Sequence, residues 1–188
     1  MKKLMIQIPC YNEEKTIREA LDALPRKISG IGSIEVLIID DGSSDNTVEE
    51  SIKAGAHYVL RLPRNMGLAK GFSAGLDACY RLGADIVVNT DADNQYCADD
   101  IPKLIEPVVN GSADIVIGDR QTDTIEHFSW YKKRLQRLGS GLVRKASGTS
   151  VVDSTSGFRA LNRKAMVSAF IHNSFTYTLE SIIHAGCQ

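Results

Sequence analysis

The chain has 188 residues, a length that suits one domain with its own apolar core. Its 22 Lys and Arg nearly balance its 23 Asp and Glu, which excludes a general nucleic-acid binder with a broad positive surface. The four cysteines form no CxxC pair and have no histidine at metal-ligand spacing, which excludes a zinc site and a disulfide framework and favours a reducing, cytoplasmic setting. No stretch approaches the roughly 18 consecutive apolar residues of a membrane span.

Short apolar runs rich in Ile and Val alternate with helical patterns in the first 120 residues. The runs predict five strands, at 4–9, 34–40, 56–62, 85–90 and 114–119. Because these runs are continuously apolar, they are typical of strands that are covered on both faces. Strands that alternate with helices predict an α/β fold, with a mostly parallel sheet flanked by helices.

Three helices are expected between these strands. Apolar residues recur at helical spacing over 17–24, with Asn12 as the expected N-cap, and over 68–79, before Gly83. A further helix is expected to begin near Ser44 or Asp45.

Polar clusters follow four of the predicted strands: PCYNEE, DDGSSD, TDADNQ and GDR. A helix cap or an ordinary turn explains each cluster when it is taken alone. However, parallel strands end at one edge of a sheet, which is where ligands of such sheets bind. The four clusters together therefore predict a functional site at that edge.

Asp91 and Asp93 leave the fourth predicted strand with one residue between them. Two close carboxylates repel each other unless a cation intervenes, and oxygen ligands without nearby histidine or cysteine favour Mg²⁺ or Mn²⁺ over zinc. Gln95 could supply a further oxygen. Such an ion keeps several waters and shares substrate phosphate oxygens, so a diphosphate is the expected partner.

The segment PRNMGLAKGFSAGL, residues 63–76, has glycines at 67, 71 and 75 where a helix is expected to open. Backbone N–H groups there, with Arg64 and Lys70, could approach phosphate. Glycines four residues apart equally allow a helix to pack closely on a sheet. The spacing differs from the GxGxxG and P-loop patterns, which disfavours hydride transfer and ATP hydrolysis.

A basic amphipathic segment occupies residues 130–145, where Lys and Arg are interspersed with Trp130, Tyr131 and several leucines. Two interpretations remain open. It is either a solvated helix packed on the sheet or an element that contacts an anionic membrane surface.

Six segments, in this order, resemble the family 2 glycosyltransferases with a GT-A fold, and particularly the dolichyl- or polyprenyl-phosphate sugar synthases. They are IPCYNEEKTI, IIDDGSSDNT, RNMGLAKGFSAGL, TDADNQY, GDR and DSTSGFRALNR, and they span nearly the whole chain. The resemblance implies a single GT-A catalytic domain over residues 1–188. It also implies a C-terminal truncation, because relatives usually continue into another strand and often into membrane helices.

The resemblance also implies roles for individual residues. The residues expected around the nucleoside and diphosphate are Pro9, Tyr11, Glu13, Asp41, Asn65, Gly67 and Lys70, with Asp41 on the base. Asp91 is expected at the ribose or the metal ion, and Asp93 and Gln95 at the metal ion. Arg120 and Arg159 are expected to face phosphate groups, and Ser156 and Gly157 to shape the turn before Arg159.

The implied activity is the inverting transfer of a sugar from a UDP- or GDP-sugar, with Mg²⁺ or Mn²⁺ as cofactor, in cell-envelope biogenesis. Polyprenyl or dolichyl phosphate is the expected acceptor, presented at the cytoplasmic face of a membrane, and its anionic oxygen needs no general base. A saccharide hydroxyl would need one, for which Asp153 and Asp119 are the candidates.

Two other classes of protein fit the sequence less well. A nucleotidyltransferase should have a loop rich in glycine and arginine where this chain has PCYNEE. A non-catalytic paralogue that only binds nucleotide sugars is disfavoured by the intact DADNQ and SGFR motifs.

Overall fold

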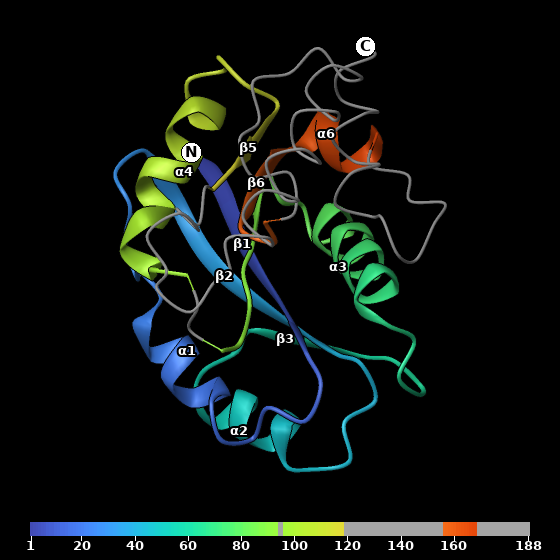
Figure 1. The fold of residues 1–188 in the computed structure, drawn as a ribbon. Coiled ribbons are helices and arrows are strands. Elements are labelled where there is room, and N and C mark those ends of the chain that lie inside the picture. The colour runs from blue at the N-terminus through green and yellow to red at the C-terminus, as the bar shows by residue number, and fades with distance from the viewer. Residues whose placement is uncertain (94–95, 119–155, 169–188) are drawn as a thin grey trace, which may run out of the picture.

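One mixed sheet organises the computed structural model, which describes residues 1–93, 96–118 and 156–168. In these residues six strands pair in the order β3-β2-β1-β4-β6-β5 (Figure 1). The strands are β1 (Lys2–Cys10), β2 (Ile31–Asp40), β3 (Tyr58–Arg61), β4 (Ile86–Asn89), β5 (Ile115–Ile117) and β6 (Arg159–Asn162). The first four are parallel, whereas β6 runs antiparallel to both β4 and β5.

All five predicted strands are confirmed, with ends that shift by up to three residues. The sixth strand, β6, was not predicted, because RALN contains only four residues and offers neither a long apolar run nor alternation. Its formation depends on pairing with β4, from which it is separated by about 70 residues of chain.

Helices cover both faces of the sheet (Figure 1). On one face lie α1 (Ile17–Ala23), α2 (Thr47–Lys53) and α4 (Ile101–Val109), the last preceded by the short helix η1 (Ala98–Asp100). On the other face lie α3 (Leu68–Arg81) and α6 (Arg163–Ser168). Among the described residues, no helix is long and apolar enough to cross a membrane.

Two apolar clusters separate the helix layers from the sheet. Successive residues of β1 alternate between them: Leu4, Ile6 and Ile8 pack beneath α1 and α4, whereas Met5 packs beneath α3. Because both faces of the strand are buried, apolar residues occupy successive positions in the middle of β1, with Gln7 as the exception, as expected for a central parallel strand. The α/β fold class is therefore confirmed.

The prediction of Asn12 as the N-cap of α1 was wrong. The N-cap is Thr16, four residues later. Asn12 has a φ of +57°, and its side-chain oxygen accepts a hydrogen bond from the Ser44 N–H at 2.9 Å. Its side chain therefore ties two loops together instead of capping a helix. The second predicted helix does begin near Asp45, whose carboxylate accepts the N–H of Thr47 at 3.0 Å.

The sequence left two interpretations open for the glycines at the start of and within α3: backbone N–H groups at a binding site, or close packing of the helix on the sheet. The structure shows that the glycines differ in this respect. Gly67 is the N-cap, with a φ of +88°, and its N–H lies at the site described below. Gly75 allows close packing, because a Cβ there would lie 2.5 Å from Gln7 Oε1 and 2.9 Å from Ile39 Cδ1. A Cβ on Gly71 would meet only Ile39 Cγ2, at an ordinary 3.7 Å.

This difference predicts opposite effects of the same substitution at two positions of α3. Gly75→Ala should lower the free energy of unfolding by about 1–3 kcal/mol, because the added methyl group overpacks the helix against β1 and β2. Gly71→Ala should be neutral or stabilising by about 0.5–1 kcal/mol, because alanine is the better helix former. Urea unfolding of both variants measures the effects, and equal destabilisation of the two would contradict this packing.

Candidate active site

The carboxyl ends of the central strands meet at one edge of the sheet, as the polar clusters predicted. Cys10 and Asp40 are partners at the ends of β1 and β2, and the Asp41 N–H donates to Cys10 O at 2.9 Å. On the other side of β1, the Thr90 N–H donates to Gln7 O at 3.1 Å. The loops that follow β1, β2 and β4 therefore leave the sheet side by side.

Side chains of the loop after β2 hold the loop after β1. The backbone N–H groups of Asn12, Glu13 and Glu14 donate to the side chains of Ser43, Thr47 and Asp45, at 2.9, 2.8 and 3.1 Å. In return, the Glu14 carboxylate accepts the N–H of Asn46. These hydrogen bonds satisfy backbone donors that a loop would otherwise expose, and they fix the rim of the site.

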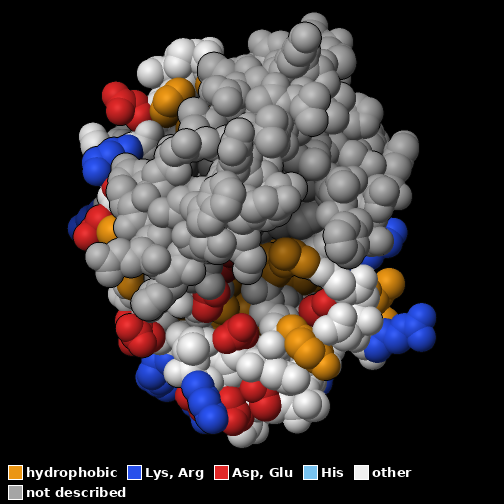
Figure 2. Space-filling model, in the orientation of Figure 1, with side chains coloured by type: hydrophobic (Ala, Val, Ile, Leu, Met, Phe, Trp, Pro, Cys, Tyr) orange, Lys and Arg blue, Asp and Glu red, His pale blue; other side chains and the backbone are white. Residues whose placement is uncertain are grey.

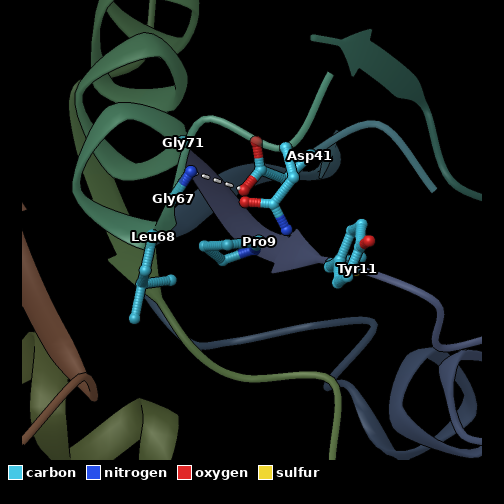
Figure 3. A pocket seen from close by; sticks show the side chains of 8 residues that line it. Pro9, Tyr11, Asp41, Gly67, Leu68 and Gly71 are labelled. Atoms are coloured by element: carbon cyan, nitrogen blue, oxygen red, sulfur yellow. Dashed lines mark hydrogen bonds between the residues drawn. The ribbon is translucent and has the colours of Figure 1, made fainter.

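A cavity opens at this edge between the ends of β1 and β2 and the start of α3 (Figure 3). It is lined by Pro9, Cys10, Tyr11, Asp41, Asn65, Gly67, Leu68 and Gly71. Five of these were predicted as nucleotide-binding residues. Cys10 and Leu68 were missed, although each lies next to a predicted residue, and Gly71 was considered only for its backbone N–H near the start of the helix.

Three predicted nucleotide-binding residues do not line the cavity. The Glu13 carboxylate instead accepts a hydrogen bond from the Thr16 hydroxyl, at the start of α1. Lys70 is exposed on the first turn of α3, and Asp91 is half-buried beyond the end of β4. Their expected roles toward a nucleotide remain predictions.

The carboxylate of Asp41 joins the two sides of the cavity. Its two oxygens accept the N–H groups of Met66 and Gly67, at 2.7 and 2.9 Å (Figure 3 shows the Gly67 bond). The next residue, Gly42, allows the approach: with a φ of +75°, it brings its backbone so near that a Cβ would lie 2.6 Å from the carbonyl carbon of Arg64. The DDG and RNMG motifs therefore form one structural unit.

The neighbouring Asp40 has a structural role. It is fully buried and accepts the N–H of Ser43 at 3.0 Å, and its second oxygen lies 3.1 Å from Nε of Arg61. Asp40 therefore stabilises the turn after β2 and the adjacent end of β3. Only the second aspartate of the DDG motif faces the cavity.

Cys10 lines the cavity but is poorly suited to be a nucleophile. Burial raises the pKa of its thiol far above the usual range, and the carboxylates of Glu13, Asp40 and Asp91 raise it further. The reactive form of cysteine is the thiolate. A covalent intermediate on Cys10 is therefore disfavoured.

The acidic turn after β4 lies beside the turn that precedes β6. A Cβ on Gly157 would lie 3.4 Å from each carboxylate oxygen of Asp91 and 3.4 Å from the Tyr96 hydroxyl. Asp93, two residues on, is exposed. The third predicted metal ligand, Gln95, lies outside the described residues.

The turn that contains Asp91 and Asp93 fits a divalent cation only as an open site, in which water and phosphate oxygens complete the coordination. Within the described parts of the chain, no group of three or more His, Cys, Asp or Glu could enclose a metal ion. Two carboxylates that leave most coordination positions to water and phosphate oxygens suit Mg²⁺ or Mn²⁺, and they do not suit a closed zinc site.

The remaining predicted residues concern phosphate groups and the acceptor. Arg159 begins β6 and is 1% exposed, and its Nε donates to the carbonyl oxygen of Ser156 at 2.7 Å. Arg120 and Asp153 lie outside the described residues, as does Asp119. The structure therefore leaves their expected roles as predictions.

A mostly parallel sheet with a cavity and an acidic turn at its carboxyl edge is the architecture of the GT-A glycosyltransferases. The family model for Glycosyl transferase family 2 matches residues 5–169. The chain belongs to this family, and the resemblance seen in the motifs is confirmed.

Individual relatives agree with this assignment. The UDP-N-acetylglucosamine–dolichyl-phosphate N-acetylglucosaminyltransferase of Methanococcus voltae is 33% identical over 183 residues, an alignment that covers 88% of this chain and 71% of the relative. The glucosyl-3-phosphoglycerate synthase of Mycobacterium tuberculosis, solved with UDP, superposes with a TM-score of 0.72 at 22% identity. Its complex with Mn²⁺, UDP-glucose and glycerol 3-phosphate gives 0.70 at 23%.

The chain spans less than two thirds of the length of the mycobacterial synthase. Each superposition includes 94% of this chain but only 63% of the synthase. The likeness establishes the GT-A fold.

The Asp41 hydrogen bonds make a prediction about stability. Asp41→Asn should lower the free energy of unfolding by about 2–3 kcal/mol, because the amide replaces a charged acceptor and turns an NH₂ group toward a backbone donor. Hydrogen exchange at the amides of Met66 and Gly67 should accelerate. Asp77→Asn, which breaks only an exposed pair with Arg81, is the matched control and should change little. Unchanged exchange at both amides in Asp41→Asn would contradict this role.

Proposed function

We propose that this protein transfers a sugar from a uridine diphosphate sugar to a polyprenyl or dolichyl phosphate, with inversion at the anomeric carbon. The observation that carries the proposal is the cavity beside the acidic turn at the carboxyl edge of a GT-A sheet. The name of the archaeal relative, a UDP-sugar:dolichyl-phosphate transferase, supports both the donor and the acceptor.

The cavity offers the chemistry that a nucleoside needs. Pro9 and the half-exposed Tyr11 give it an apolar wall, and the carboxylate of Asp41 gives it an acceptor. Each carboxylate oxygen has two lone pairs and uses one of them on a backbone amide, so Asp41 can also accept an N–H from the base.

The start of α3 suits the diphosphate. A helix N-terminus presents backbone N–H groups and the positive end of the helix dipole, and α3 has 14 residues. Lys70 lies on its first turn, and Arg64 lies in the loop before it. The diphosphate would extend from the cavity toward the turn that contains Asp91 and Asp93.

Asp91 and Asp93, with Gln95, would hold a Mg²⁺ or Mn²⁺ ion. When it is bound, the ion neutralises the charge that develops on the departing nucleoside diphosphate. Because Asp91 is packed against Gly157 while Asp93 is exposed, Asp91 would set the position of the site and Asp93 would face the donor phosphates.

The acceptor determines whether a base is needed. A lipid monophosphate is already anionic near neutral pH and can attack the anomeric carbon without losing a proton. Arg159 and Arg120 are then the residues proposed to face phosphate groups. Transfer to a saccharide hydroxyl would instead require a carboxylate base, for which Asp153 and Asp119 are the candidates.

The central experiment is an assay of sugar transfer to polyprenyl phosphate, with UDP- and GDP-sugars and with Mn²⁺. The wild-type protein should transfer from a UDP-sugar. Asp93→Ala should lower the rate by at least about 100-fold, because the metal contributes several kcal/mol to the transition state. Asp99→Ala removes another exposed carboxylate, six residues further on, and should retain the wild-type rate.

Each result of this assay has a defined meaning. Full activity in Asp93→Ala would remove Asp93 from the metal site. Transfer only to saccharide hydroxyls would replace the lipid acceptor, and transfer only from GDP-sugars would replace the donor. If no nucleotide sugar is turned over or raises the melting temperature of the wild-type protein, the protein is not a transferase of this kind.

We also propose peripheral contact with the cytoplasmic face of a membrane through residues 130–145, which lie outside the described residues. The support is the sequence, which places several cations among aromatic and leucine residues. A lipid phosphate acceptor would be presented at such a surface.

Membrane contact can be measured by sedimentation with vesicles that contain phosphatidylserine. Replacing Lys132, Lys133 and Arg134 by alanine should weaken partitioning roughly 100-fold, at about 1 kcal/mol for each charge. The control replaces the exposed Arg26, Lys27 and Arg81, which removes the same charge elsewhere. Equal loss in both triple variants would mean that net charge, and not this segment, drives binding.

A further inference from the structure

A row of buried polar side chains crosses the sheet on the face beneath α3. Gln7 of β1 and Asn89 of β4 are 0% and 1% exposed, and they are direct partners in the parallel pairing of the two strands. Gln7 Nε2 donates to Asn89 Oδ1 at 2.9 Å. Uncharged polar side chains in the centre of a sheet cost stability unless they are hydrogen-bonded, so their presence at these positions requires an explanation.

In this row each side chain donates a hydrogen bond to the next residue, in the order Cys79, Gln7, Asn89 and Gly157, so the donors all point toward the turn beside Asp91. The Cys79 thiol of α3 donates to Gln7 Oε1 at 3.9 Å, which leaves the Gln7 amide nitrogen to donate to Asn89. Because Asn89 Oδ1 accepts that bond, Asn89 Nδ2 points away from Gln7. It donates to Gly157 O at 2.8 Å. Burial raises the pKa of the Cys79 thiol to about 12, so the thiol keeps its proton near neutral pH.

The row ends at Gly157, whose backbone N–H and C=O groups are both hydrogen-bonded to side chains. Asn89 binds the carbonyl oxygen of Gly157, and the Gly157 N–H donates to the Tyr96 hydroxyl at 3.0 Å. The Tyr96 ring is in turn stacked on Phe158, with 5.1 Å between ring centroids. The Gly157 turn therefore has little freedom to move.

The Gly157 turn is also the surface against which the Asp91 carboxylate rests. A Cβ on Gly157 would lie 3.4 Å from both Asp91 oxygens, so the carboxylate lies close to this turn, and a displacement of the turn toward it would crowd the carboxylate. A metal site tolerates little displacement of its ligands, and the groups that orient those ligands commonly alter metal affinity when they are replaced.

We propose that Gln7 and Asn89 are positioning residues, which hold the Asp91 carboxylate in place for the cation through the Gly157 turn. They lie under the site and do not touch the substrate. This inference rests on the proposed function, because it takes Asp91 as part of the metal site.

The test compares the response to Mn²⁺ of the wild-type protein and Asn89→Leu, which keeps the size of the side chain and removes its donor. The Mn²⁺ concentration that gives half-maximal transfer should rise about 10–100-fold. The KM for the UDP-sugar, measured at saturating Mn²⁺, should change less than about twofold. The rise in melting temperature that Mn²⁺ causes in the presence of UDP should shrink, which gives a second readout without turnover.

Two further variants separate positioning from stability. In Gln7→Met/Asn89→Leu both partners of the buried hydrogen bond become apolar, which can restore much of the stability but should not restore the response to Mn²⁺. Tyr96→Phe removes only the acceptor for the Gly157 N–H and keeps the ring stacked on Phe158. If Asn89→Leu does not fold, this variant tests whether the Gly157 turn positions Asp91. It should also raise the Mn²⁺ requirement. Val108→Ala, on the buried face of α4, is the control for general destabilisation and should not raise the Mn²⁺ requirement.

The outcomes distinguish this inference from the function on which it rests. A normal Mn²⁺ requirement in the folded variants, with a normal thermal response, would overturn the positioning role. An equal rise in Val108→Ala would also overturn it. A wild-type protein that neither transfers sugar nor responds to Mn²⁺ with UDP would overturn the proposed function itself.

Discussion

The paired hydrogen bonds from Met66 and Gly67 to the Asp41 carboxylate are the interaction on which the site depends. They connect the end of β2 to the start of α3, two elements separated by β3 and α2 in the chain. Without this anchor, the positive end of α3 would not be fixed over the ends of β1 and β2. One carboxylate joins the two sides of the cavity, and Gly42 supplies the room for that contact.

Burial of polar groups explains much of the remaining construction. The α3 face of the sheet contains Gln7, Asn89 and Arg159, which are almost completely buried on three adjacent strands. Gly75 lets α3 lie directly on Gln7, which removes water from the row. A hydrogen-bonded row in such surroundings has few alternative arrangements, so it is well suited to fix the turn above it.

The sheet edge could be predicted because it follows from local patterns, whereas five of the residues that line the cavity were named through the family resemblance. Five apolar runs became strands, and the polar clusters after β1, β2 and β4 lie together, as parallel topology requires. The errors have physical causes. Asn12 has the residue type of an N-cap, but its backbone is left-handed and its side chain bonds across to Ser44. The strand β6 and the link from Asn89 to Gly157 depend on contacts between distant segments, which no local pattern reveals.

The placement of β6 has a consequence for how the protein folds. The cavity is lined by residues between Pro9 and Gly71, whose strands and helices are neighbours in the sequence. The turn at Gly157, from a distant part of the chain, reaches its place beside Asp91 when β6 pairs with β4. Closing a long loop is slower than joining neighbouring elements. During synthesis from the N-terminus, the chain can therefore complete the cavity well before the surroundings of Asp91 are in place.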